Sequence, residues 1–245
     1  MRVLSISFKF NIVSRKWIVL LDYDGTLTPI HARPQEAKID KNRKRFLEDL
    51  SRKHKLAIIT GRDLNSFIAV FGSVPKTIYL ITSHGAKIYK GESLIADFSG
   101  SKVPDLHELR EKVKGMEGVF VEEKDGCFAI HFREYRGDEN RVKEAFYEFV
   151  EKNPPSRTIE GKKILEALYG DFDKGRGVER FLGVVGWKGG EKLLYVGDDT
   201  TDLFALRRVR ELGGRAVFVG EKKPPEANEL VRSVEDVYNL LRALG

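Results

Sequence analysis

The chain contains very little cysteine and histidine. Its 245 residues include one cysteine, Cys127, and five histidines. A single cysteine excludes an internal disulfide and is typical of a reducing compartment. One thiol and a few scattered histidines also disfavour a zinc site. We therefore expect a cytoplasmic protein that has neither a disulfide framework nor bound zinc.

Long apolar runs are absent as well. No stretch approaches the roughly 20 apolar residues that cross a bilayer. Residues 1–16 combine one early arginine, Arg2, with a broken apolar stretch, which does not match a signal peptide. We expect no membrane partner and assign residues 1–16 no function.

The sequence also lacks a strong excess of charge of one sign. Its 43 basic residues are interleaved with 37 acidic ones, which leaves a net charge of +6. This mixture describes a solvated surface with a mild bias toward anionic substrates, and it does not indicate nucleic acid. A hydrophobic content of 41% suffices for one large domain or two modest ones. We expect a monomer with a small anionic partner.

Three common functional motifs are missing. Gly161-Lys162 is followed by Lys163 and not by the Ser or Thr of a Walker loop. The stretch Lys174 to Gly177 has neither the preceding first strand nor the third glycine of a dinucleotide fingerprint. No Gly-x-Ser-x-Gly elbow occurs. P-loop, dinucleotide and serine-elbow chemistry are therefore not expected.

The rest of the chain is organised around WIVLLDYDGTLTP, Trp17 to Pro29. Its first five residues form a largely apolar strand, and Asp22 and Asp24 follow where Gly25 permits a sharp turn. Ligands of an open parallel sheet bind beyond the carboxyl ends of its strands. Two carboxylates this close suit phosphoryl transfer if a cation neutralises them or one is protonated. The alternative is an ordinary polar turn.

A second stretch, KLLYVGDDTTD, repeats this design. The apolar strand Leu193 to Val196 is followed by three carboxylates, those of Asp198, Asp199 and Asp202. A helix that begins near Thr200 would place Asp198 and Asp202 on one side of its first turn, where the helix dipole favours negative charge. Oxygen-only ligands fit a hard cation. Together the two strand ends predict a Mg²⁺ site.

Alternating strands and helices on either side of the middle predict a βαβ architecture. Before residue 102 the expected elements are strand Trp17 to Leu21, helix Lys41 to Lys53, strand Lys55 to Ile59, a helix capped by Asp63 and strand Thr77 to Ile81. From residue 171 they are helix Val178 to Val185, strand Lys192 to Val196, a helix to Leu212, strand Arg215 to Val219 and a helix from Val234. Residues 1–102 and 171–245 would form one α/β domain with a doubly wound parallel sheet.

Residues 103–170 depart from this rhythm. They predict helix Leu106 to Lys114, strands Val119 to Lys124 and Cys127 to Phe132, helix Arg141 to Lys152, and strands Arg157 to Glu160 and Lys163 to Ala167. The Asp125-Gly126 junction between the first two strands is a strong hairpin signal. We interpret this segment as a smaller inserted α+β cap.

Together these motifs resemble the haloacid dehalogenase (HAD) superfamily of aspartyl-phosphate phosphatases. Its four motifs correspond to Asp22 to Thr26, Thr60, Lys174, and Gly197 to Asp202. The resemblance implies a HAD-like core in which Asp22 is the nucleophile, Asp24 is the acid and then the base, and Thr60 and Lys174 hold the phosphoryl oxygens. It also implies a Mg²⁺ site built from Asp22, Asp24, Asp198, Asp199 and Asp202.

Within the superfamily the chain is most similar to the trehalose-6-phosphate phosphatases. DYDGTLTP, Pro34 and Ala37 match the opening of that family, and Ser83 to Ala86 match its third strand end. The resemblance implies Mg²⁺-dependent hydrolysis of trehalose 6-phosphate. It places substrate contacts at Thr26, Gly61, Arg62, His84, Glu123, Lys124, His131, Arg133 and Glu166. One departure is that Leu203 and Phe204 follow Asp202, where the family carries further acidic residues.

Two other hypotheses stay open. A phosphatase of another sugar phosphate, of the sucrose-6-phosphate or mannosyl-3-phosphoglycerate type, could share this core and differ in the cap. A non-catalytic sugar-phosphate sensor could also keep the fold. The combination of Asp22, Asp24 and Lys174 argues against the sensor, because a pure binder needs neither nucleophile nor acid.

Overall fold

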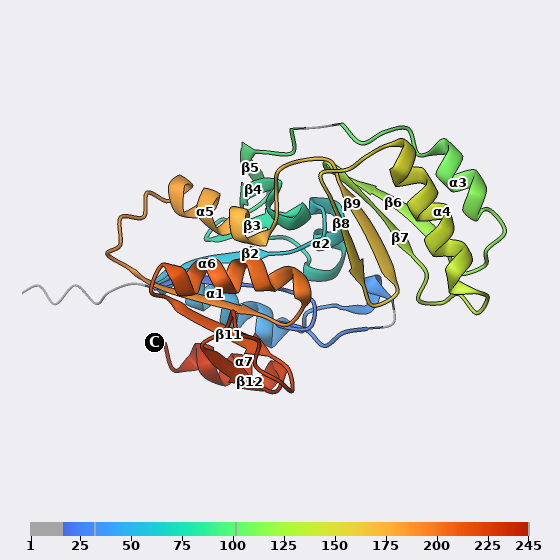
Figure 1. Cartoon of the computed structure of the whole chain (residues 1–245). Helices are drawn as coiled ribbons and strands as arrows, with labels where there is room; N and C mark the ends of the chain where they lie inside the picture. The colour runs from blue at the N-terminus through green and yellow to red at the C-terminus, as the bar shows by residue number, and fades with distance from the viewer. Residues whose placement is uncertain (1–16, 32, 101, 245) are drawn as a thin grey trace, which may run out of the picture.

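The computed structural model describes residues 17–31, 33–100 and 102–244, which form two β-sheets with helices packed against each (Figure 1). Residues 1–16, to which we assign no function, lie outside the described part of the chain. Within the described ranges, no helix has both the length and the apolar composition needed to cross a bilayer.

The larger sheet has eight strands, with β1 between β10 and β2 near its centre. In spatial order the strands are β12 (Glu229–Val231), β11 (Arg215–Val219), β10 (Lys192–Gly197), β1 (Trp17–Leu21), β2 (Lys55–Ile59), β3 (Ile78–Thr82), β4 (Lys87–Lys90) and β5 (Ser93–Asp97). Strands from β12 to β3 are parallel, whereas β4 and β5 pair antiparallel. The sequence predicts the parallel strands except β12. It misses β4, β5 and β12, which are four, five and three residues long and carry no distinct apolar pattern.

Helices cover both faces of this sheet (Figure 1). One face packs against α1 (Lys41–Lys53), α2 (Leu64–Phe71) and α7 (Val234–Arg242), and the other against α5 (Lys174–Val184) and α6 (Leu203–Glu211). In β1, Val19 and Leu21 face the first group while Ile18 and Leu20 face the second. All four are fully buried, and each such side chain contributes about 1.5–3 kcal/mol. The doubly wound α/β core predicted from the sequence is confirmed.

The first residues of helices α2 and α5 are set by the aspartates that cap them. Asp63 accepts a hydrogen bond of 2.6 Å from the Ser66 N–H, so α2 begins where predicted. Asp173 accepts one of 2.9 Å from the Arg176 N–H, and α5 therefore begins at Lys174 and not near Val178. Short 3-10 turns precede or follow the strands: η1 (Pro34–Glu36), η2 (Ser83–Gly85) and η3 (Thr200–Asp202).

The cap segment, residues 103–170, builds the second sheet. Its four antiparallel strands lie in the order β6 (Phe120–Lys124), β7 (Cys127–His131), β9 (Ile164–Leu168) and β8 (Arg157–Gly161). Helices α3 (His107–Val113) and α4 (Glu139–Lys152) pack on one face. The predicted turn at Asp125-Gly126 joins β6 to β7, with Gly126 at φ +68°.

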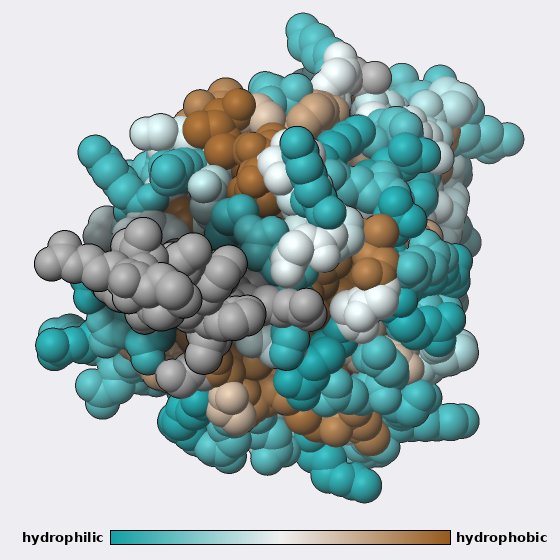
Figure 2. Space-filling view, turned by 90° about the vertical axis from the view of Figure 1, so that its left-hand side faces the viewer, coloured by the Kyte–Doolittle hydropathy of each residue, from teal (hydrophilic) through white to brown (hydrophobic). Residues whose placement is uncertain are grey.

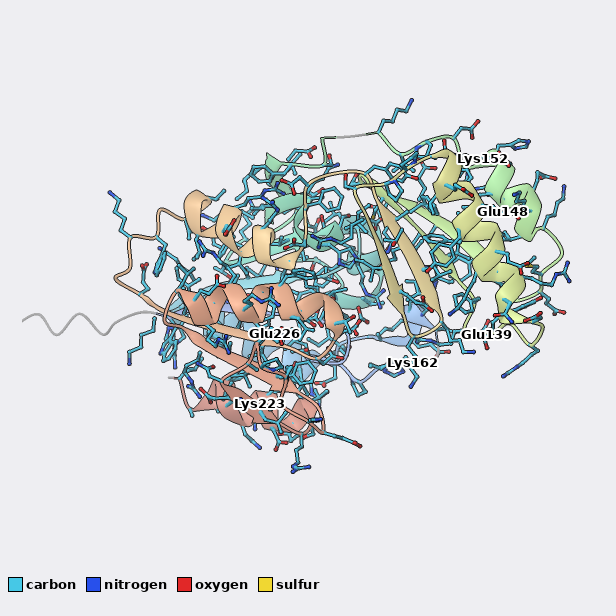
Figure 3. The ribbon with its side chains drawn as sticks, viewed as in Figure 1. Glu139, Glu148, Lys152, Lys162, Lys223 and Glu226 are labelled. Carbon is cyan, nitrogen blue, oxygen red and sulfur yellow. The ribbon has the colours of Figure 1, made fainter. Side chains whose placement is uncertain are left out.

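Charged side chains support the outer layer of the cap segment. Figure 3 labels Glu148 and Lys152 on α4, which pair with Lys112 and Glu108 of α3. Exposed ion pairs of this kind are each worth about 0–1 kcal/mol, so the cap segment is stabilised mainly by its own apolar cluster.

The surface at the opposite end of the molecule is mostly hydrophilic, with separate hydrophobic patches (Figure 2).

Ion pairs also join the cap segment to the larger sheet and its loops. They are Arg33–Glu134 at 2.6 Å, Lys87–Asp125 at 2.7 Å and Arg157–Asp173 at 3.2 Å. These contacts hold the helix-free face of the small sheet over the carboxyl ends of the central parallel strands.

Candidate active site

A cleft of about 370 Å³ lies between the two sheets, within the size range of small-molecule sites. Its core wall includes Asp22, Asp24, Thr60, Gly61, Arg62, His84 and Lys174. Its other wall includes Phe120, Glu122, Lys124, His131, Arg133 and Glu166. The structure therefore brings most of the predicted site residues into one cleft.

The Lys174 ammonium joins the two acidic strand ends. Its Nζ donates to Asp22 Oδ1 at 2.6 Å and to Asp202 Oδ1 at 2.7 Å, and all three residues are buried. Burial and the neighbouring Asp202 charge raise the pKa of Asp22 well above its usual value. Burial opposes the charge on Lys174, but the two carboxylates outweigh it and raise the pKa of that ammonium. Lys174 therefore stays charged beside Asp22.

Asp202 uses its whole carboxylate inside the protein. Oδ1 accepts from Lys174 and from the Tyr195 hydroxyl, while Oδ2 accepts the N–H groups of Asp198 at 3.1 Å and Asp199 at 3.0 Å. These four donors occupy the roughly four acceptor positions of a carboxylate. Asp202 therefore fixes the loop after β10, and its place among the metal ligands stays a prediction.

Asp198 is a second carboxylate of this loop that lies close to Asp22. Oxygens of Asp22, Asp198 and Asp202 lie within 4.8 Å of one another. The Thr26 hydroxyl donates to Asp198 Oδ1 at 3.0 Å. Gly25 has φ +90°, and a Cβ there would lie 2.0 Å from Asp198 Oδ2. Burial and the Asp202 charge raise the pKa of Asp198 to about 7. Three carboxylates share the positive charge of one lysine, Lys174, in this cluster.

Two predicted residues have other roles in this loop region. Asp199 turns its carboxylate to the Thr200 N–H at 2.7 Å and so caps η3. Among the described residues, the carboxylates that lie close enough together to share an ion do not include that of Asp199. Thr26 is fully buried and orients Asp198, so it does not line the cleft as a substrate contact would.

Asp24 lies in the cleft and is paired with Arg62. The guanidinium donates from Nε to Asp24 Oδ2 and from Nη2 to Asp24 Oδ1, each at 2.7 Å, and Nη2 also reaches the Pro34 carbonyl at 2.7 Å. Such a two-point ion pair fixes the carboxylate plane as well as its position. Arg62, predicted as a substrate contact, thus uses Nε and Nη2 for Asp24 and the η1 turn, and its contact with substrate stays a prediction.

The loops after β2 and β3 are tied to each other. Thr60 is almost fully buried, and its carbonyl accepts the His84 N–H at 3.0 Å. Ser83 and His84 have positive φ values of 48° and 57°, a conformation that costs free energy and is enriched at functional sites. A Cβ on Gly61 would lie 2.6 Å from His84 Cε1, so only glycine lets the imidazole sit there.

A second lysine-centred cluster faces the cleft from the small sheet. Lys124 Nζ lies 2.9 Å from Glu166 Oε1 and 3.6 Å from Glu122 Oε2. His131 Nε2 is 2.8 Å from Glu122 Oε2, and His84 Nε2 is 3.2 Å from Glu166 Oε2.

Both carboxylates of this second cluster are stabilised by their neighbours. Burial disfavours the Glu122 carboxylate, but the His131 hydrogen bond and the Lys124 charge lower its pKa to about 2. Burial likewise opposes the Glu166 carboxylate, and Lys124 and His84 outweigh it to hold that pKa below its ordinary value. Both glutamates are therefore ionised at neutral pH.

Glu123 is the predicted cap residue that the structure places elsewhere. Side chains alternate along β6, so Glu122 and Lys124 face the cleft while Glu123 faces away and pairs with Arg110 of α3 at 3.2 Å. Glu122 is the residue that the sequence reasoning missed. The sequence does contain the signal, because residues two apart on a strand share a face and Lys124 is itself a predicted sugar contact. Arg133 lines the cleft near the His31 and Lys162 carbonyls, to which it donates.

Comparison with known proteins identifies the family of the chain. The model of the trehalose-phosphatase family matches residues 20–228. The chain belongs to this family. Trehalose-phosphate phosphatase B of Arabidopsis thaliana is 30% identical over 242 residues, covering 89% of this chain and 63% of that protein. The chain thus spans less than two thirds of that relative.

Solved structures show the same fold. The C. albicans trehalose-6-phosphate phosphatase C-terminal domain superposes with a TM-score of 0.78 at 22% identity, covering 94% of this chain and 92% of that one. A haloacid dehalogenase-like hydrolase from Bacteroides thetaiotaomicron does so with a TM-score of 0.67 at 14% identity, covering 94% and 98%. The predicted HAD-like fold is confirmed.

This trehalose-phosphatase family chain departs from the expected acidic pattern after Asp202, and the structure shows what occupies the position. Phe204 is 40% exposed on α6. The Arg157 guanidinium of β8 lies 4.5 Å from the centre of its ring and also pairs with Asp173. Arg157 of the cap segment thus makes a cation–π contact with the Phe204 ring of the core.

Proposed function

We propose that this protein hydrolyses trehalose 6-phosphate to trehalose and phosphate through an aspartyl-phosphate formed on Asp22. One observation carries the proposal. The buried Asp22–Lys174 pair lies at the end of a cleft whose opposite wall presents Lys124, Glu122 and Glu166. A phosphoryl group suits the first wall, and sugar hydroxyls suit the second. Membership of the trehalose-phosphatase family supports the same substrate.

In the first step, an Asp22 oxygen attacks phosphorus and the bond from phosphorus to the sugar oxygen breaks. Asp24 gives a proton to that leaving oxygen. In the second step, water gives a proton to Asp24 and attacks phosphorus, and the bond to Asp22 breaks. The Arg62 pair orients the Asp24 carboxylate within the cleft in its ionised form, which is the form that takes the proton from water in the second step.

Lys174 and Thr60 would hold the phosphoryl oxygens. Lys174 is charged and already in contact with Asp22, so it can offset charge that develops on the phosphoryl group. Its place at the first residue of α5 adds the positive end of the helix dipole.

The crowded carboxylates fit a Mg²⁺ ion. Asp22, Asp198 and the Asp24 carbonyl would hold it, next to Asp202, which anchors the loop, while Asp199 caps η3. Bound there, Mg²⁺ supplies positive charge for the reacting phosphate oxygens. The raised pKa values of Asp22 and Asp198 support a cation site, because added positive charge would favour both carboxylates.

We further propose that residues 103–170 act as the specificity cap over the core formed by the rest of the chain. Lys124, His131, Arg133 and Glu166, joined by Glu122 in place of Glu123, would contact the sugar. The expected cytoplasmic location and monomeric state stay predictions.

Phosphate release from a panel of sugar phosphates with and without Mg²⁺ tests this function. We expect trehalose 6-phosphate to give the highest kcat/KM, and chelation to abolish turnover. A clear preference for sucrose 6-phosphate or mannosyl-3-phosphoglycerate would favour the alternative phosphatases. Binding of trehalose 6-phosphate without phosphate release in Mg²⁺ would favour a sensor.

A further inference from the structure

The cleft wall of the cap segment contains one exposed aromatic side chain, Phe120. It is the first residue of β6, it lines the cleft, and 46% of it is exposed. The other large aromatics exposed in the described part of the chain, Tyr147 and Phe204, do not line this cleft. An apolar ring open to solvent on a cleft wall that also presents Glu122 and Lys124 is informative, because a ligand can cover it.

The ring of Phe120 is held rigidly from one side. It stacks on the His131 imidazole with ring centres 4.4 Å apart and planes 9° apart. The imidazole is fixed in turn by Glu122, which accepts from Ser66 Oγ at 3.3 Å in addition to its contact with His131. Since His131 covers one face of the phenyl ring, its remaining face is the part that a ligand can reach.

This arrangement has the chemistry of a sugar-stacking surface. A pyranose ring carries C–H groups on one face and hydroxyls around its rim. Phe120 supplies a flat apolar face, while Glu122 and Lys124, on the same side of β6, supply charged acceptors and donors. At about 3.3 Å per residue, Lys124 lies roughly 13 Å along the strand from Phe120. The aromatic face is therefore separated from the Lys124–Glu166–His84 end of the cleft wall.

We propose that Phe120 is the stacking platform for the sugar ring that does not carry the phosphate, and that it selects disaccharide phosphates over monosaccharide phosphates. This inference rests on the proposed function. Phe120 touches no reacting atom, so its contribution is to specificity.

The test compares Phe120→Leu, Phe120→Trp and the matched control Tyr147→Leu, which removes an equally exposed aromatic from α4 outside the cleft. The measured quantity is the ratio of kcat/KM on trehalose 6-phosphate to that on glucose 6-phosphate, which lacks the second ring. We expect Phe120→Leu to lower this ratio about tenfold, the scale of a lost apolar contact in a binding pocket. Phe120→Trp keeps a stacking face and should hold the ratio, as should Tyr147→Leu.

Calorimetric titration with trehalose, a ligand without phosphate, separates this inference from the proposed function. We expect binding to weaken about tenfold in Phe120→Leu and to persist in Phe120→Trp. Ring-dependent sugar binding in a protein that releases no phosphate would refute the proposed function and leave the platform standing. Full phosphatase activity with an unchanged ratio and unchanged trehalose affinity in Phe120→Leu would overturn the platform alone.

Discussion

The two walls of the cleft are built around the same motif, a buried lysine between two carboxylates. In the core, Lys174 lies between Asp22 and Asp202 at 2.6 and 2.7 Å. In the cap segment, Lys124 lies between Glu166 and Glu122 at 2.9 and 3.6 Å. The geometry is similar, but the pKa values of the carboxylates are shifted in opposite directions.

The difference lies in the surrounding charge. Burial and Asp202 raise the pKa values of Asp22 and Asp198 in the core, because one ammonium serves three nearby carboxylates. In the cap segment the pKa values of Glu122 and Glu166 are lowered despite burial, because Lys124 and two histidines face them. The core cluster therefore lacks positive charge and suits a cation and a phosphoryl group. The cap cluster keeps its carboxylates ionised without an added cation, and such fixed acceptors and donors suit neutral hydroxyls.

We expect the largest effect from a substitution in the core cluster. Asp22→Asn keeps the shape of the side chain but removes the nucleophilic charge, so turnover should fall by about 10⁴-fold or more on every substrate. Steady-state phosphate release measures this, with circular dichroism as the folding control. Substantial turnover by the pure, folded Asn variant would refute Asp22 as the nucleophile.

A smaller loss should follow from Asp24→Asn, and it should depend on the leaving group. An alkyl sugar oxygen needs a proton as it leaves, whereas p-nitrophenolate needs little help. We expect kcat on trehalose 6-phosphate to fall about 10²- to 10⁴-fold, and kcat on p-nitrophenyl phosphate to fall much less. Equal losses on both substrates would assign Asp24 a purely structural role.

The cap cluster provides a matched pair of variants on adjacent residues. Glu122→Ala removes a carboxylate from the cleft, whereas Glu123→Ala removes one from the opposite face of β6. We expect Glu122→Ala to cost about 2 kcal/mol in kcat/KM toward trehalose 6-phosphate, the scale of a charge-assisted hydrogen bond. Glu123→Ala should leave kcat/KM within twofold of the wild type. The reverse order would mean that the wrong face of β6 is assigned to the substrate.

The smallest effect concerns stability at low pH. The pKa of Glu122 is lowered from 4.5 to about 2, so its carboxylate stabilises the fold above the ordinary pKa, and this contribution is lost as the pH falls from 4.5 toward 2. Urea unfolding of wild type and Glu122→Gln should show this. The wild type should be the more stable protein at pH 6, and the difference should shrink steadily below pH 4.5. A difference that stays constant over that range would contradict the ionised, paired Glu122.

The sequence predicts where the core site lies but not which cap residue faces it, for a physical reason. Asp22 and Thr60 each follow a short run that is buried on both faces, and parallel strands bring their carboxyl ends to one edge. In β6, acidic residues stand side by side at Glu122 and Glu123. Which of them faces the cleft depends on the face that α3 and α4 cover, and this is a property of the packed sheet.

The acidic cluster at the strand ends is predicted in place but not in detail. Its acidic residues cluster as expected, yet the role of Asp202 depends on which donors surround it. Tyr195 lies within an apolar strand and gives no sign in the sequence that its hydroxyl reaches Asp202. The backbone N–H groups of Asp198 and Asp199 reach the same carboxylate only because η3 folds back over β10.

The most direct test of the comparison is the effect of removing each central lysine on two substrates. Lys174→Met and Lys124→Met are assayed for kcat/KM on trehalose 6-phosphate and on p-nitrophenyl phosphate, which is too small to reach the cap cluster. We expect Lys174→Met to lower both values together, so that their ratio stays near that of the wild type. Lys124→Met should lower the ratio by about 30-fold, the equivalent of roughly 2 kcal/mol, while p-nitrophenyl phosphate turnover shows that the variant is folded. An unchanged ratio in Lys124→Met would contradict the division of the cleft into a reacting wall and a recognising wall.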